Sequence, residues 1–147
     1  MLKTDPKYGV YPWWPEDGDD WVHPEDVATA RRMIPGWRVF RRDGRVGPYV
    51  VLHYGDVRLR VRPTLWIKIR SEGLDIGDWV EVKSRGKKNT ARTGTICEML
   101  YNPWSKRLVY RILEHGLPIE TLYHAEDLQP VEPTQPNVWS NAIRGPG

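Results

Sequence analysis

Apolar and polar residues alternate along much of the chain after Trp37, with the period of two that is typical of β-strands. This alternation predicts strands at residues 37–42, 49–54, 57–62 and 65–69. Two pairs of turn residues, Asp43-Gly44 and Gly55-Asp56, separate the first three of these strands. Strands that are joined by such short turns pair antiparallel. The pattern therefore predicts an antiparallel four-stranded meander.

The segment before the meander shows neither the period of 3.6 that is typical of helices nor the period of two that is typical of strands. Prolines and glycines interrupt residues 8–21 too often for a helix, and no alternation indicates a strand. We therefore predict an irregular arm, which is ordered only if its aromatic rings are buried. On this interpretation Trp13, Trp14 and Trp21 stabilise the fold.

One short helix is predicted between the arm and the meander, at residues 23–34. Pro24 suits its first turn, and Pro35-Gly36 should end it. The arm, the helix and the meander together form the first predicted unit, residues 1–70.

The second half of the chain contains five further short strands. They are predicted at residues 78–83, 93–101, 107–114, 117–123 and 129–131. A single 3₁₀ turn at residues 125–128 precedes the last of them. Five short strands in about 55 residues are typical of a small closed barrel. The second predicted unit spans residues 76–131, and the proline-containing tail at 132–147 is expected to be disordered.

Three motifs in this half resemble the SH3-like barrels of the Tudor and KOW kind. They are Gly77-Asp78-Trp79-Val80-Glu81-Val82, Gly94-Thr95-Ile96 and Tyr123-His124-Ala125-Glu126-Asp127-Leu128. The resemblance covers about residues 76–131 and implies a five-stranded SH3-like barrel, and it says more about fold than about function. The opening block is also similar to an uncharacterised bacterial domain of unknown function.

Charge is distributed unevenly along the chain. Residues 1–26 hold two basic and seven acidic side chains, residues 27–115 hold 19 basic and eight acidic, and residues 116–147 hold one and four. The net charges are therefore −5, +11 and −3, which sum to the overall +3. Such a basic middle is either a surface that binds polyanions or one that the acidic N-terminal segment partly neutralises.

Nucleic acid is the partner that this basic region favours. Arg58, Arg60 and Arg62 alternate with apolar residues, so they share one face of their strand. A second basic group lies in the turn that follows residue 83, and it consists of Arg85, Lys87, Lys88 and Arg92. Both groups suit phosphates, and nearby rings such as Tyr49, Tyr54 or Trp66 suit stacking with bases. The competing interpretation is an ordinary solvated strand face and a surface turn.

A module that binds an extended peptide of another protein is the alternative function. SH3-like barrels often bind extended or proline-rich peptides in aromatic grooves. The candidate rings for such a groove are Trp79, Tyr101, Trp104 and Tyr123. The chain carries a segment of this kind itself, Pro12-Trp13-Trp14-Pro15, which could dock on its own barrel.

No motif in the sequence points to a reaction, so we expect a non-enzymatic protein without cofactor. The glycine, serine and histidine patterns of common nucleotide-binding and hydrolytic sites are absent from the sequence. Cys97 is the only cysteine, and the four histidines are scattered, so we predict no catalytic residue and no metal site. A single cysteine and the lack of a long apolar run indicate a cytoplasmic protein that does not enter membranes.

Overall fold

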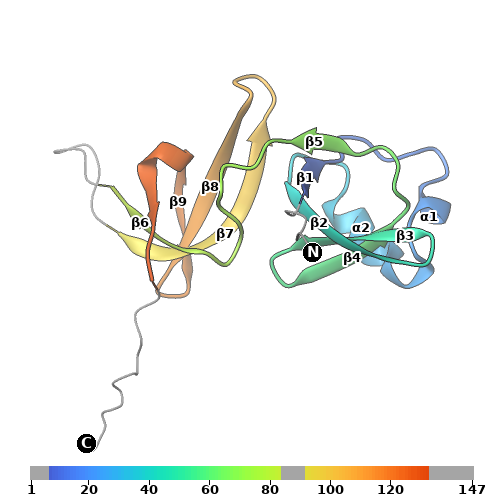
Figure 1. The fold of residues 1–147 in the computed structure, drawn as a ribbon, viewed down its shortest axis with the longest axis horizontal. Coiled ribbons are helices and arrows are strands. Elements are labelled where there is room, and N and C mark those ends of the chain that lie inside the picture. The colour runs from blue at the N-terminus through green and yellow to red at the C-terminus, as the bar shows by residue number, and fades with distance from the viewer. Residues whose placement is uncertain (1–6, 84–91, 133–147) are drawn as a thin grey trace, which may run out of the picture.

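The computed structural model describes residues 7–83 and 92–132, which form two antiparallel five-stranded sheets and a few short helices (Figure 1). The first sheet consists of β1 (Lys7–Val10), β2 (Phe40–Val46), β3 (Tyr49–Tyr54), β4 (Val57–Val61) and β5 (Ile67–Ile69). The second consists of β6 (Trp79–Val82), β7 (Thr93–Asn102), β8 (Arg107–Glu114), β9 (Leu117–Tyr123) and β10 (Leu128–Pro130). The mostly β class predicted from the sequence is confirmed.

The first sheet departs from the predicted four-stranded meander in its strand order, which is β4-β3-β2-β1-β5. The arm is not wholly irregular, because its start forms β1 between β2 and β5. The predicted fourth strand, β5, consequently pairs with β1 and not with β4. The free edge of β4 is instead covered by the arm, where the His23 amide donates to Arg60 and the Arg62 amide to Trp21. Sequence periodicity could not reveal this exchange of neighbours.

The first predicted turn also lies elsewhere. β2 continues through Asp43 and Gly44, with an irregularity between Arg42 and Arg45, and the chain turns only after Val46. Gly44 has a φ of 105°, which a residue in a regular strand does not adopt, so it absorbs the irregularity. The second predicted turn is confirmed, because Tyr54 and Val57 pair directly across two residues.

Three short helices lie between β1 and β2. They are α1 (Gly18–Trp21), the 3₁₀ turn η1 (Pro24–Asp26) and α2 (Val27–Met33). The last two occupy the helix predicted at residues 23–34, whereas α1 was not predicted. Gly18 lies so close to the indole of Trp14 that a Cβ atom would not fit between them.

The core of the first unit lies between its sheet and these helices. Tyr11 and Trp21 meet edge to face with ring centroids 5.0 Å apart, and Trp14 contacts Trp21 in the same manner. Trp13 differs from these residues, because it is 40% exposed. The ring of Trp21 is therefore buried as expected and that of Trp14 is partly buried against the core, whereas that of Trp13 is not buried.

The second sheet has the strand order β10-β6-β7-β8-β9, and all five strands lie where the sequence predicts them. The 3₁₀ turn η2 (Ala125–Asp127) precedes β10, as expected. Irregularities between Ile96 and Glu98 and between Arg111 and Leu113 interrupt the regular pairing of β7, β8 and β9. Among the strands described, no pairing joins β9 to β10, so the ladders give an open sheet and do not establish the predicted closed barrel.

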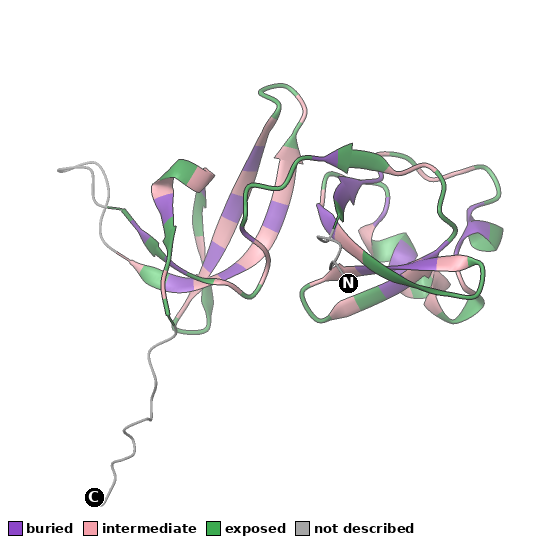
Figure 2. Cartoon of the chain, in the orientation of Figure 1, coloured by how far each residue is buried: buried purple, intermediate pink, exposed green. Residues whose placement is uncertain are grey.

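The two sheets share buried residues. Tyr8, Val10, Val39 and Ile69 of the first unit pack into the core of the second sheet. Buried positions accordingly run along both sheets where they approach each other (Figure 2). Met99 of β7 lies at this contact, and its backbone amide donates to the Tyr54 hydroxyl at 3.0 Å while its carbonyl accepts from the Val39 amide at 2.9 Å.

The connection between the two sheets is held by side chains from both of them. The hydroxyl of Tyr8 and the guanidinium of Arg41 both donate to Asp75, at 3.0 and 2.9 Å. The hydroxyl of Tyr110 in β8 donates to Glu72 at 2.7 Å. These contacts position residues 70–78 against both sheets. None of the helices in the described ranges has the length and apolar character that crossing a membrane requires.

Candidate nucleic-acid interface

The three arginines of β4 differ in their surroundings. Asp26 of η1 accepts hydrogen bonds from the backbone amide of Arg60 at 2.9 Å and from its Nε at 2.8 Å. Glu25 accepts a further bond from Arg60 at 3.1 Å. The side chain of Arg60 is only 16% exposed. Because Asp26 and Glu25 both belong to the acidic N-terminal segment, this segment neutralises the charge of Arg60. Of the two interpretations left open for the basic middle, partial neutralisation therefore applies at this residue.

The outer two arginines are more accessible. Arg62 donates its Nε to the carbonyl of Asp20 at 3.1 Å, and its guanidinium lies 5.5 Å from the ring centroid of Tyr49. Arg58 is exposed, and its side chain has no hydrogen-bond or ion-pair partner among the described residues. A phosphate could therefore approach Arg58 and Arg62 without first breaking an ion pair.

The pairing with Arg60 makes Asp26 a source of acid sensitivity. Hydrogen bonding to the Arg60 side chain, more than any other contact, lowers the pKa of Asp26 from its usual 3.8. A carboxyl group with a lowered pKa stabilises the folded state above its unfolded pKa, and this contribution is lost as the pH falls through the folded pKa. We predict that Asp26→Asn loses less of its unfolding free energy than the wild type between about pH 7 and about pH 3. Urea denaturation at both pH values measures this difference, and equal losses in the two proteins would contradict it.

Three of the four residues in the second predicted basic group lie outside the described residues. They are Arg85, Lys87 and Lys88. Arg92 is described, and it donates to Glu114 at 3.3 Å, so its charge is partly compensated.

The rings proposed for base stacking fall into two groups. Tyr54 is unsuitable, because its hydroxyl bonds to Met99 inside the protein, and burial raises the pKa of Tyr54 to about 12. Tyr49 and Trp66 are partly exposed, and each carries an arginine over its ring, Arg62 and Arg42 respectively.

The four rings proposed for peptide binding are not brought together. Trp79 pairs with Thr95, and Tyr101 lies six residues further along β7, which is a distance of about 20 Å at the rise of a strand. Tyr123 is buried in the core and Trp104 lies beyond the end of β7. A single groove therefore cannot use all four rings. Trp79 lines a shallow pocket with Gly77, Asp78, Pro130 and Val131, and none of the other three rings belongs to that pocket.

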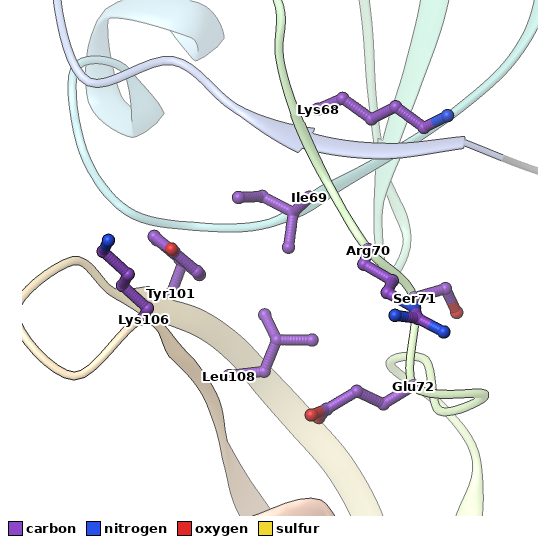
Figure 3. A pocket seen from close by; sticks show the side chains of 8 residues that line it. All are labelled: Lys68, Ile69, Arg70, Ser71, Glu72, Tyr101, Lys106 and Leu108. Atoms are coloured by element: carbon purple, nitrogen blue, oxygen red, sulfur yellow. The ribbon is translucent and has the colours of Figure 1, made fainter.

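The structure reveals a further cleft where β5 and the segment after it meet the β7–β8 hairpin, which we call the junction cleft (Figure 3). Its volume is about 440 Å³, within the range of about 300 to 1,000 Å³ that ligand pockets of small molecules occupy. It is lined by Lys68, Ile69, Arg70, Ser71, Glu72, Tyr101, Lys106 and Leu108. Of these residues, the sequence pointed only to Tyr101, as a candidate ring for peptide binding. It did not point to the basic residues Lys68, Arg70 and Lys106.

The junction cleft combines an apolar floor with cationic sides. Ile69 and Leu108 are buried and form the floor, with the ring of Tyr101 beside them (Figure 3). Arg70 and Lys106 are exposed, come from opposite sides of the cleft, and have no hydrogen-bond or ion-pair partner among the residues described. Glu72 is the one acidic residue of the eight, and its carboxylate accepts a hydrogen bond from the Tyr110 hydroxyl. The side chain of Lys68 extends away from the others.

The tip of the β7–β8 hairpin adjoins this cleft and presents an exposed ring. The side-chain oxygen of Asn102 accepts from the amides of Trp104 and Ser105, at 2.9 and 3.2 Å, so the backbone of the tip is held in one conformation. Trp104 is nevertheless 90% exposed. Binding residues occur disproportionately on loops that a rigid scaffold holds in place, so this ring is a candidate for recognition.

In the described part of the chain, neither the lone thiol nor the acidic residues show the features that activate a thiol or gather around a metal ion. Burial, followed by the neighbouring carboxylate of Glu98, raises the pKa of Cys97 and disfavours the thiolate. No three His, Cys, Asp or Glu side chains of residues 7–83 and 92–132 gather as metal ligands do. The absence of an enzymatic activity stays a prediction.

Comparison with known proteins identifies a family. Residues 1–129 match the Family of unknown function (DUF6960), a range that includes the first sheet, the junction cleft, the hairpin tip and the second sheet except for the last residue of β10. This agrees with the similarity of the opening block to a domain of unknown function. Comparisons with curated proteins and with solved structures find no match.

Proposed function

We propose that this chain, which belongs to that family of unknown function, binds single-stranded nucleic acid and catalyses no reaction. One observation carries the proposal: Arg70 and Lys106, which have no side-chain partner among the described residues, line one cleft with the half-exposed ring of Tyr101, and the exposed Trp104 lies two residues before Lys106. Proteins that bind single strands combine cations along the phosphate backbone with rings on which bases stack, at about 1 to 3 kcal/mol per base. A cytoplasmic location, expected from the sequence, belongs to the same proposal.

Other basic residues extend this surface. Arg58 is unpaired among the described residues, and Arg62 lies over Tyr49, so both suit additional phosphates. Arg60 is unsuited to this role, because a phosphate would have to displace Asp26 and Glu25. The overall charge of only +3 favours moderate affinity that depends strongly on salt.

We also interpret the second sheet as an SH3-like fold of the Tudor and KOW kind. Its strand order places the last strand, β10, beside the first, β6, and η2 precedes β10. Both features support the interpretation. A fold of this kind is compatible with nucleic acid and with peptide partners, so it does not decide the function.

Binding of a fluorescently labelled single-stranded oligonucleotide to the full chain tests the proposed function. We expect binding at about 50 mM salt, and a decrease with added salt by a slope of about 0.7 for each phosphate contact. Duplex DNA of the same length should bind more weakly, because its bases are not available to the rings. A wild-type chain that does not bind any single strand at about 50 mM salt would refute the proposal.

The second candidate function is a module that binds an extended peptide. It is favoured by the pocket of about 390 Å³ in which Trp79 adjoins Pro130 and Val131. Apolar contacts with a peptide should change little with salt, unlike phosphate contacts. Trp79→Ala should therefore abolish peptide binding and leave oligonucleotide binding unchanged. The reverse result would assign Trp79 to the nucleic-acid surface.

A further inference from the structure

We infer that a single strand crosses the junction cleft and inserts one base into it, with one phosphate at Lys106 and the next at Arg70. This inference rests on the proposed function and names the place and the form in which the strand is bound. It also implies that the protein selects unstacked strands, because a base inside a duplex cannot enter a cleft of this shape.

The floor and the wall of the cleft suit a base. Ile69 and Leu108 offer a buried apolar surface, and Tyr101 lies beside them with its ring partly exposed. Trp37 contacts Tyr101 at a centroid distance of 6.1 Å, which supports the ring from another side. Base faces are apolar and stack on such rings regardless of base identity.

The sides of the cleft suit the flanking phosphates. Arg70 follows β5 and Lys106 precedes β8, and Figure 3 shows that they approach the cleft from opposite sides. Neither has to give up a partner among the described residues in order to bind an anion. Two cations across an apolar floor match a chain in which charged phosphates alternate with uncharged bases better than they match a single compact anion.

The carboxylate of Glu72 keeps its negative charge, but its position in the cleft is fixed. The hydroxyl of Tyr110, a core residue, donates to Glu72 at 2.7 Å, which holds the carboxylate toward β8. The carboxylate of Asp75, three residues further along the chain, likewise accepts hydrogen bonds from Tyr8 and Arg41. The cleft wall formed by residues 70–72 is therefore held in place before any ligand binds, which reduces the entropy lost on binding.

The hairpin tip supplies a stacking surface for the neighbouring base. Trp104 lies two residues before Lys106, and Asn102 holds its backbone. A base that follows the phosphate at Lys106 can therefore stack on Trp104 with little loss of protein entropy. Such stacking should quench the fluorescence of this tryptophan.

The charge part of the inference is tested with a pair of double variants in the oligonucleotide binding assay. We expect R70Q/K106Q to weaken binding about tenfold or more at about 50 mM salt, and to lower the salt slope by about 1.4, which is 0.7 for each of two contacts. The matched control is R32Q/R45Q, which removes the same charge from two exposed arginines outside the cleft. The control should bind within about threefold of the wild type.

The ring part is tested separately, with variants that keep the charge. Tyr101→Leu should weaken binding about tenfold, whereas Tyr101→Phe, which keeps the ring, should bind as the wild type does. Trp104→Ala should remove most of the fluorescence quenching by the oligonucleotide. Polyglutamate at the same charge concentration as the oligonucleotide carries charges but no bases, so it should not displace the strand.

The outcomes separate the two proposals. Wild-type binding with equal losses in R70Q/K106Q and R32Q/R45Q, or an unaffected Tyr101→Leu, would overturn the assignment to the cleft and leave the proposed function standing. Displacement by polyglutamate would show that the cleft binds acidic peptides as well, and would overturn the inserted base. The absence of wild-type binding would refute the proposed function itself.

Discussion

Replacing Trp21 with alanine should lower the free energy of unfolding by about 3 to 5 kcal/mol, the usual cost of removing a large aromatic ring from a core. Trp21 is only 5% exposed, and it packs edge to face on Tyr11 and on Trp14. The substitution also removes the hydrogen bond from its indole nitrogen to the Thr64 hydroxyl, which is 3.0 Å long. Urea denaturation of the two proteins measures the difference.

Trp104→Ala is the control for this prediction, because it removes the same side chain from an exposed position. We expect its unfolding free energy to stay within about 0.5 kcal/mol of the wild type. A loss below about 1 kcal/mol in Trp21→Ala would mean that the arm is not ordered by its buried rings.

The second large effect is expected at the contact between the sheets. Met99 is fully buried, and its backbone is bonded to Tyr54 and Val39 of the first unit. We expect Met99→Ala to cost about 2 to 5 kcal/mol, through lost burial and the cavity that remains. Met33→Ala, at a partly buried position of α2, should cost less.

The same variant tests whether the sheets unfold together. Since residues of the first sheet complete the core of the second, Met99→Ala should shift a single unfolding transition. Circular dichroism and tryptophan fluorescence should then report the same midpoint. Two separate transitions, only one of them shifted, would show that each sheet is stable without the other.

The positions of charged partners explain why the proposed binding surface is not centred on the most regular basic row of the sequence. Arg58, Arg60 and Arg62 form the most regular basic row in the sequence, yet Arg60 is paired with Asp26, 34 residues away. Arg70 and Lys106 of the junction cleft, which have no side-chain partner among the described residues, lie outside the two basic groups that the sequence singles out. We therefore place the proposed anion contacts by the lack of a partner in space and not by charge density along the sequence.

The elements of the second sheet followed from the sequence alone. β8 and β9 have the predicted bounds, residues 107–114 and 117–123, because their alternation and the His115-Gly116 turn between them are local signals. The hairpin of β3 and β4 at Gly55 was predictable for the same reason. Each of these features depends on residues that are adjacent in the chain.

Tertiary structure alone decided the neighbours of β1 and β5, the pairing of Arg60 and the junction cleft. β1 joins β2 and β5 across more than 30 and more than 50 residues, and short segments of this kind carry too little periodicity to reveal a partner. The cleft forms only because the contact between the two sheets brings Arg70 and Lys106 to opposite sides of one cavity. Sequence periodicity determines which face of a strand is apolar, whereas the packing of distant segments determines which polar groups on the other face stay free to bind.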